Sequence, residues 1–235
     1  MPKVLIIGAQ GGLGRALAEV YGKAGFEIAS LGREECDLSV PEAVARLAAD
    51  RDFLEAGYDL CVFTAAISEG GYADVLDGDA LRRCMEVNFL SEVTLFTALA
   101  SAPSGCRRFV FVGSGAADVL LPGLLPYSLS KRALRDYLYV ADMEKSFPDC
   151  YILMVSPGSM DTGFDRKAKL HGTYALPRGM PARPPQWVAK RIFEAERHGK
   201  ARLNLAPLPT ILGWFQRLAP RLTLPVIRRL SRLAR

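Results

Sequence analysis

Tyr127 and Lys131 are separated by four positions at the start of a helical pattern that covers residues 128–145. A step of four residues places two side chains on one face of a helix. An ammonium group beside a phenol favours the phenolate and lowers the pKa of the tyrosine. Such a tyrosine could exchange a proton with a substrate oxygen. The alternative is a surface pair, because a chain with eight tyrosines produces this spacing by chance.

A glycine-rich segment, residues 8–14, follows a short apolar run at residues 3–8 and precedes a helical pattern at residues 13–23. Glycines let a backbone turn tightly and approach a pyrophosphate, while the first turn of a helix offers free N–H groups. Tight turns also need glycine for their own geometry. The position between an N-terminal strand and a helix favours binding of a dinucleotide over a structural turn.

Two further polar residues precede the Tyr–Lys pair. Ser114 follows the apolar run 108–113, and Asn88 lies in the middle of a helical pattern at residues 81–100. Taken separately, Asn88 could be a helix-surface residue and Ser114 a turn former. Taken together with the glycine loop, these groups favour one active site, because independent parts agree on the same context.

The whole set resembles the short-chain dehydrogenase/reductase family. Gly8, Gly12 and Gly14 match the three glycines of its GxxxGxG loop, and residues 157–162 resemble its PGxxxT segment. The four polar residues match its Asn–Ser–Tyr–Lys tetrad: Asn88, Ser114, Tyr127 and Lys131. The resemblance implies that Tyr127 is the general acid or base, and that Ser114 binds the substrate oxygen. It also implies that Lys131 holds the nicotinamide ribose, and that Asn88 holds a water that links Lys131 to solvent.

The resemblance further implies which residues bind the cofactor, and it includes two departures. Ile7 replaces the usual threonine before the first glycine, and residues 64–67 (TAAI) replace the usual NNAG. The second departure puts the packing near the adenosine in doubt but removes no proton-transfer group. Besides the tetrad members Asn88, Tyr127 and Lys131, the expected cofactor-binding residues are Gly8, Gln10, Gly11, Gly12, Leu13, Gly14, Arg33, Asp37, Leu38, Thr64, Ala65, Ala66, Pro157, Gly158, Met160 and Thr162.

Arg33 ends the second apolar run, at the position that meets the adenosine ribose in dinucleotide folds. An arginine there accommodates the 2′-phosphate of NADP, whereas an acid binds the 2′-hydroxyl of NAD. Glu34 and Glu35 follow at once and could take the second role. We therefore expect NADP, with NAD as the alternative. Asp37 and Leu38 resemble the family's Asp-aliphatic step near the adenine, but the usual intervening helix is missing, which leaves a compact bypass.

The segment 163–186 lies where the family carries its substrate loop. It is basic, and such a lid could attract a carboxylate, a phosphate or a carrier-bound acyl group; it could equally be a solvated mobile loop. Against the single acid Asp165, it contains Arg166, Lys167, Lys169, His171, Arg178 and Arg183. The run 120–125 would place apolar groups beside Tyr127, so an apolar substrate body fits.

Apolar runs of strand length alternate with helical patterns along the chain, which predicts an α/β, Rossmann-like doubly wound parallel sheet. The strand runs are 3–8, 26–31, 60–65, 108–113 and 152–155, and the helical patterns are 13–23, 41–50, 81–100, 128–145 and 185–198. We expect one dinucleotide-binding domain over residues 1–200 and a basic amphipathic extension over residues 201–235.

The charge of the chain is unevenly placed. Residues 1–196 carry 21 Lys/Arg and 25 Asp/Glu, whereas residues 197–235 carry nine Lys/Arg and no acid. Four prolines break the extension, yet Ile211, Trp214 and Phe215 recur at helical spacing, and residues 226–233 form a basic amphipathic pattern. Such a tail can lie on an anionic membrane, or its apolar face can pack on the body or on a second subunit.

The remaining expectations concern context. Five scattered cysteines without a CxxC pair indicate reduced thiols in a cytoplasmic protein, with peripheral membrane association as the variant. We expect no metal site and no nucleic-acid partner, a small carbonyl or alcohol substrate, and a homo-oligomer by analogy with the family. Two other functions stay open: a non-catalytic dinucleotide-binding regulator, and an epimerase or dehydratase of the related extended family. The short remainder after Thr162 argues against the second.

Overall fold

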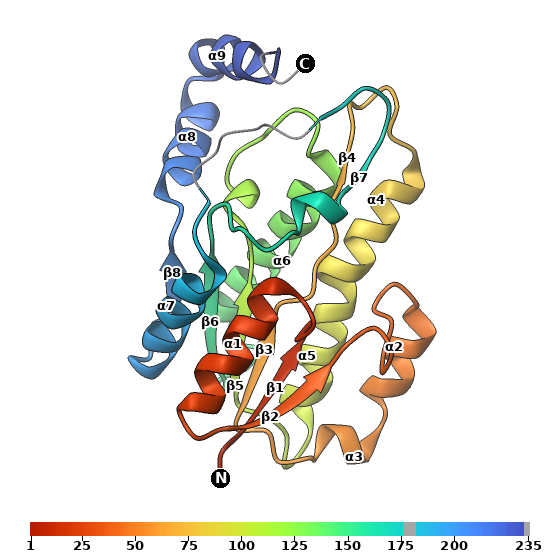
Figure 1. Cartoon of the computed structure of the whole chain (residues 1–235), viewed down its shortest axis with the longest axis vertical. Coiled ribbons are helices and arrows are strands. Elements are labelled where there is room, and N and C mark those ends of the chain that lie inside the picture. The colour runs from red at the N-terminus through yellow and green to blue at the C-terminus, as the bar shows by residue number, and fades with distance from the viewer. Residues whose placement is uncertain (176–181, 233–235) are drawn as a thin grey trace.

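The fold is built on six parallel strands, and the computed structural model describes residues 1–175 and 182–232 (Figure 1). The strands run in the order β2-β1-β3-β5-β6-β8. Their bounds are β1 (Lys3–Ile7), β2 (Glu27–Leu31), β3 (Leu60–Phe63), β5 (Arg108–Val112), β6 (Tyr151–Ser156) and β8 (Arg202–Asn204). The predicted α/β class with a doubly wound parallel sheet is confirmed.

Helices cover both faces of this sheet. On one face lie α1 (Gly12–Lys23) and α7 (Pro185–Arg197), and on the other lie α2 (Pro41–Ala48), α5 (Ser91–Ser101) and α6 (Leu125–Glu144). The predicted helix 81–100 is longer and not uniform: α4 (Gly78–Met85) continues through a π-helical turn (Glu86–Leu90) into α5. A short helix, α3 (Arg51–Leu54), precedes β3.

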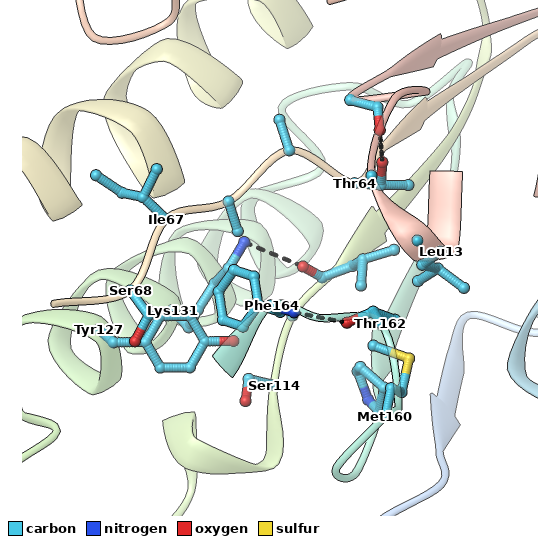
Figure 2. A pocket seen from close by; sticks show the side chains of 18 of the residues that line it. Leu13, Thr64, Ile67, Ser68, Ser114, Tyr127, Lys131, Met160, Thr162 and Phe164 are labelled. Atoms are coloured by element: carbon cyan, nitrogen blue, oxygen red, sulfur yellow. Dashed lines mark hydrogen bonds between the residues drawn. The ribbon is translucent and has the colours of Figure 1, made fainter. Parts of the chain in front are cut away.

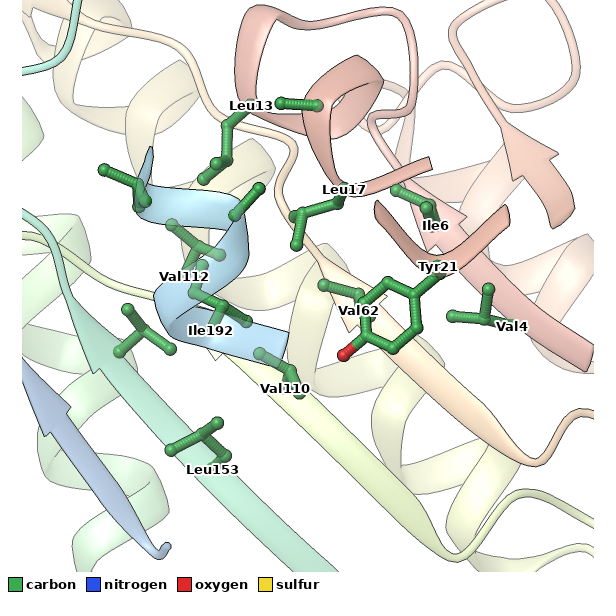
Figure 3. Close-up of a cluster of buried hydrophobic side chains, with 14 of the residues drawn as sticks. Val4, Ile6, Leu13, Leu17, Tyr21, Val62, Val110, Val112, Leu153 and Ile192 are labelled. Carbon is green, nitrogen blue, oxygen red and sulfur yellow. The ribbon is translucent and has the colours of Figure 1, made fainter. Parts of the chain in front are cut away.

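Strand residues alternate between two apolar cores, as successive side chains of a strand must. Val4 and Ile6 of β1 point into the core with α1 and α7, where Tyr21 and Ile192 are fully buried (Figure 3). Leu5 and Ile7 point into the opposite core. Continuous burial on both faces explains why β1, β3 and β5 are almost entirely apolar.

The chain reverses its direction across the sheet at β1, since β2 pairs on one side of β1 and β3 on the other. In open parallel sheets, ligands bind at such a switch point, beyond the carboxyl ends of the strands. Between β2 and α2, residues 32–40 contain no strand or helix. The predicted compact bypass is therefore present, and β2 is the edge strand.

The segment after β6 is held down by a two-stranded pairing of β4 (Glu69–Gly70) with β7 (Lys169–Leu170). The buried carboxylate of Glu69 accepts hydrogen bonds from Arg83 at 2.6 and 2.9 Å. It also lies 2.8 Å from Nε2 of His171. The described part of the substrate loop is thus attached to the body, while the predicted contribution of Arg178 lies outside the described residues.

The C-terminal extension forms two helices, α8 (Pro207–Leu218) and α9 (Pro220–Arg232), in blue in Figure 1. Pro207 and Pro220 stand at their first turns, where a missing N–H costs nothing. Pro225 lies inside α9 without ending it. Among the described residues, no helix combines the length and the apolar character that crossing a bilayer requires. Leu233 and Arg235 of the predicted amphipathic pattern lie outside the described residues.

Candidate active site

One cavity of about 690 Å³ lies beyond the carboxyl ends of β1, β3, β5 and β6 and joins the glycine loop to the Tyr–Lys pair. Every residue predicted for the site lines it except Asn88. The cavity residues among them are Gly8, Gln10, Gly11, Gly12, Leu13, Gly14, Arg33, Asp37, Leu38, Thr64, Ala65, Ala66, Ser114, Tyr127, Lys131, Pro157, Gly158, Met160 and Thr162. A regulator and an enzyme would both need the glycine-loop end of this cavity, which suits a dinucleotide. Only an enzyme needs the end that holds Ser114, Tyr127 and Lys131.

The glycine loop requires glycine for close approach. Gly8 has a φ of +90°, and a Cβ atom there would lie 2.6 Å from the backbone nitrogen of Ala65. A Cβ atom on Gly14 would lie 2.3 Å from the carbonyl oxygen of Gly8. The first turn of α1 has neither a side-chain cap nor an acidic residue. Its N–H groups and the positive end of the helix dipole are therefore suited to a phosphate, and the loop fits a dinucleotide.

Thr64 replaces the asparagine that the family usually carries after the strand equivalent to β3. Its Oγ1 donates to the carbonyl oxygens of Ile7 at 2.9 Å and Gly8 at 3.2 Å. The backbone nitrogens of Thr64 and Ala65 donate to Ile7 as well. The threonine thus ties β3 to the start of the glycine loop, so the departure leaves this junction closely packed.

Ser114 and Tyr127 face each other in the cavity (Figure 2). Ser114 caps a 3₁₀ turn (Gly115–Ala117), where its Oγ accepts the N–H of Ala116 at 3.1 Å. Its hydroxyl hydrogen therefore remains able to donate toward the cavity. Burial raises the pKa of Tyr127 to about 12, and a hydrogen bond with Ser114 opposes that rise.

Lys131 does not produce the lowered tyrosine pKa that the sequence suggested. Its ammonium is almost fully buried and donates to the carbonyl oxygen of Val112 at 3.1 Å. It also donates to Oε1 of Glu92 at 3.2 Å. A carboxylate beside the ammonium compensates its charge, so burial dominates the pKa of Tyr127. Glu92 was not among the predicted residues, because a single acid in a helical pattern carries no signal of its partner 39 positions later.

Asn88 lies behind the cavity, fully buried in the π-helical turn. Its Oδ1 accepts the N–H of Ile67 at 2.8 Å, and its Nδ2 donates to the carbonyl oxygen of Ile67 and to Oγ of Ser130, both at 2.9 Å. It therefore connects the loop after β3 with the helix that carries Tyr127 and Lys131. The predicted water between Asn88 and Lys131 stays a prediction.

The wall beside Tyr127 is apolar. The ring of Phe164 lies 5.6 Å from the ring of Tyr127, centroid to centroid (Figure 2). Leu121 and Leu124, from the run predicted to be apolar, line the same cavity, and Pro209 of α8 reaches it from the C-terminal extension. Sequence reasoning missed Phe164 and Pro209, since neither belongs to a recognisable motif.

Arg33 lines the cavity at the carboxyl end of β2 with its side chain 74% exposed. Its nearest carboxylate, Asp37, is 3.9 Å away. Hydrogen bonds from the backbone and side chain of Ser39 lower the pKa of Asp37. Glu35 accepts the N–H of Gly32 at 2.7 Å and does not line the cavity. The described residues contain no cluster of His, Cys, Asp and Glu that could hold a metal ion.

Comparison with known proteins gives a family match over most of this site. The model of the short chain dehydrogenase family matches residues 35–171, more than half of the chain. The chain belongs to the short-chain dehydrogenase family. It is therefore an NAD(P)-dependent oxidoreductase by family, as the sequence predicted.

Two relatives and one solved structure illustrate the likeness. Dehydrogenase/reductase SDR family member 7B of Rattus norvegicus is 28% identical over 93% of this chain and 78% of the relative. A 3-dehydrosphinganine reductase of Danio rerio is 29% identical over 63% of this chain and 46% of the relative. A short chain dehydrogenase from Burkholderia cenocepacia J2315, in complex with NADP, superimposes with a TM-score of 0.74 at 21% identity, covering 97% of both chains.

Proposed function

We propose that this short-chain dehydrogenase is an NADP-preferring reductase of lipophilic carbonyl compounds. The observation that carries the proposal is the convergence of the glycine loop, Arg33, Ser114, Tyr127 and Lys131 on one cavity. The cofactor, when bound, supplies the hydride for reduction or accepts it in the reverse direction.

The residues of this chain supply the proton and the orientation. Tyr127 donates its phenolic proton to the substrate oxygen, and Ser114 donates a hydrogen bond to the same oxygen, which stabilises the charge that develops there. Lys131 lies on the same face of α6 as Tyr127 and is suited to hold the nicotinamide ribose from the β5 side. Asn88 fixes α6 through Ser130.

The preference for NADP rests on the charges at the carboxyl end of β2. Arg33 lines the cavity with an exposed side chain, and its ion pair with Asp37 is long, at 3.9 Å, so its guanidinium can form charge-assisted hydrogen bonds with a 2′-phosphate. Of the two competing acids, Glu35 accepts the N–H of Gly32, and neither Glu34 nor Glu35 lines the cavity. The NADP complex of the Burkholderia relative agrees with this assignment.

A lipophilic substrate agrees with the wall formed by Leu121, Leu124 and Phe164 and with the name of the Danio relative, a 3-dehydrosphinganine reductase. A ketone on an alkyl chain would place its oxygen between Ser114 and Tyr127 and its chain along this wall. Burial of each methylene contributes about 0.8 kcal/mol, so long chains should bind more tightly than short ones.

The C-terminal helix α8 supports a peripheral membrane contact. One face packs on the body: Gln216 exchanges two hydrogen bonds with the backbone of Leu120, and Gly213 lies against Asp118. The opposite face exposes five large apolar side chains: Leu208, Ile211, Trp214, Phe215 and Leu218. We name these five residues the α8 apolar face.

An anionic lipid surface matches this face. No acidic residue stands between positions 197 and 235, so the segment that carries this face is purely basic and suits lipid phosphates. Pro209, next to the α8 apolar face in sequence, lines the cavity. A lipophilic ketone could therefore enter from the bilayer without crossing water.

A homo-oligomer remains a separate part of the proposal. On α6, the side chains of Tyr139, Val140 and Met143 are 49%, 47% and 68% exposed and share one face near the end of the helix. Burial of such a face between two subunits would account for its composition.

The test is NADPH consumption with a series of unbranched ketones of increasing chain length, measured with and without anionic vesicles. We expect turnover that rises with chain length and that Tyr127→Phe abolishes. Tight NADPH binding with no turnover across ketones, quinones and aldehydes would favour the non-catalytic regulator. Conversion of a sugar nucleotide without net cofactor consumption would favour the epimerase alternative.

A further inference from the structure

The carboxylate of Glu92 is buried directly behind the reacting residues. Its Oε1 binds the ammonium of Lys131 at 3.2 Å, and the two side chains are 0% and 2% exposed. Its Oε2 is buried and has no hydrogen-bond partner among the described residues. Glu92 itself does not line the cavity, whereas Lys131 does. The acid therefore acts on the cavity only through Lys131 and through its electric field.

Stability alone does not account for this acid. Burial raises the pKa of Glu92 to about 7, and the charge of Lys131 acts against that rise. Replacing a buried ion pair by apolar groups is often neutral or stabilising, because the desolvation cost is large. Leu95 and Phe96, one turn further along α5, fill the neighbouring core with apolar side chains. We therefore look for the role of this acid in its effect on Lys131 and not in stability.

We propose that Glu92 is a positioning residue that holds the ammonium of Lys131 against Val112 and compensates its charge, so that Tyr127 stays protonated and the site favours carbonyl reduction over alcohol oxidation. This rests on the assignment of Tyr127 as the proton donor under the proposed function. In reduction, a hydride adds to the carbonyl carbon of the substrate and the proton of Tyr127 adds to its oxygen. The phenolate left behind is then reprotonated from solvent. Oxidation instead requires the phenolate at the start.

The groups that surround the phenol determine the direction in which loss of the Glu92 charge shifts the pKa of Tyr127. Ser114 from the end of β5 donates or accepts a hydrogen bond and lowers the pKa of Tyr127. Asp165 from the substrate loop, Glu92 from α5 and Cys84 from α4 raise it, in addition to burial. Lys131 would lower the pKa if its charge were not compensated. Removing the charge of Glu92 deletes one raising influence and releases one lowering influence, so both effects act in the same direction.

The experiment is a tyrosinate titration in the near ultraviolet on the full chain, from about pH 8 to about pH 12.5, with folding checked by circular dichroism at each pH. Subtracting the titration of the matching Tyr127→Phe protein isolates Tyr127 from the other seven tyrosines. We expect Tyr127 in Glu92→Gln to ionise at a pH lower by about one unit than in the wild type, a tenfold larger acid constant. Glu92→Asp, which keeps the charge, should remain close to the wild type.

Glu196→Gln is the matched control. Glu196 of α7 is also a buried acid with one paired oxygen and one that has no partner among the described residues, but it binds Arg108 at the start of β5, away from the cavity. Its variant should leave the Tyr127 titration unchanged. Equal titrations in Glu92→Gln and wild type, or an equal shift in Glu196→Gln, would overturn the proposal. No turnover is needed for this readout, so its failure is separate from a failure to find a substrate.

A second variant covers the case in which Glu92→Gln does not fold. Glu92→Met removes the same charge with an apolar side chain of similar volume, which suits the apolar neighbours Leu95 and Phe96. Tyr127 should ionise at a lower pH in Glu92→Met than in the wild type. The same or a higher pH would contradict a role of Glu92 in keeping the phenol protonated.

Discussion

Gly12 at the start of α1 and Thr162 after β6 are in direct contact: a Cβ atom on Gly12 would lie 2.7 Å from the Cβ of Thr162 and 2.9 Å from its Cα. The contact joins the glycine loop to the segment 157–162, and both line the cavity. A dinucleotide bound there would therefore lie against two loops that touch each other.

Gly12→Ala should separate these loops. Because the clash involves the backbone of Thr162, no side-chain rotation relieves it, and overpacking of this kind costs about 1–3 kcal/mol. We expect NADPH affinity, measured by fluorescence titration, to fall about tenfold or more, since 1.4 kcal/mol corresponds to a factor of ten. Gly78→Ala is the control, because a Cβ atom there would meet nothing within 4 Å. Unchanged affinity in Gly12→Ala would mean that the two loops do not hold the cofactor together.

Tyr127→Phe should leave NADPH binding nearly intact and abolish turnover, because the change removes only the transferable proton. General acid catalysis contributes about 100- to 10,000-fold, and the loss in kcat should fall in this range. Stopped-flow or steady-state NADPH consumption measures the rate, and titration measures the binding. Wild-type rates in the variant would show that another group protonates the substrate.

Arg33→Ala should weaken NADPH binding far more than NADH binding. The 2′-phosphate would lose a charge-assisted hydrogen bond of about 1.5–3 kcal/mol, whereas NADH has only a neutral 2′-hydroxyl at this position. Calorimetric titration of both cofactors gives the two affinities directly. Equal losses for NADPH and NADH would exclude Arg33 as the group that distinguishes them.

Trp214→Ser combined with Leu218→Ser should reduce co-sedimentation with anionic vesicles, because the two side chains are 62% and 63% exposed on the α8 apolar face. High salt should weaken binding of the wild type, since the arginines act through screened charges. Val140→Ser combined with Met143→Ser removes two exposed apolar groups from α6 instead. That variant should keep vesicle binding and lose the oligomer by light scattering.

The two pairs of substitutions therefore distinguish two uses of exposed apolar surface. If the wild type never sediments with anionic vesicles, the membrane part of the proposal is wrong. If the α8 variant dissociates the oligomer and the α6 variant does not, then α8 is the subunit contact.

Local sequence patterns predicted much of the architecture because the elements concerned have strong local signals. The apolar runs at β1, β3 and β5 are buried on both faces. The absence of a helix directly after β2 was visible because only three residues separate Arg33 from Asp37 in the sequence. Strand β8 was missed because its three residues, Arg202–Asn204, include only one apolar side chain. Its place in the sheet is fixed by pairing with β6 and not by its own composition.

In the site, too, residues in local motifs were predicted, and residues that act through distant partners were missed. The glycine loop and the Tyr–Lys spacing are local motifs, so they were found. Glu92 and Phe164 act through partners that lie far away along the chain, and only the fold brings them to Lys131 and Tyr127. The pKa of Tyr127 could not be derived from spacing either, because it depends on burial and on the sum of several distant charges.

The packing of α1 against α7 has a consequence for synthesis on the ribosome. Tyr21 is fully buried, and its ring lies 5.1 Å from the ring of Phe193. The first helix of the chain is therefore covered by α7, which is synthesised after five of the six strands of the sheet. While the ribosome is still making residues 24–184, the apolar face of α1 has no native cover. Nascent chains shorter than about 200 residues should therefore expose Leu17 and Tyr21, and they are the stage at which chaperones have most to bind.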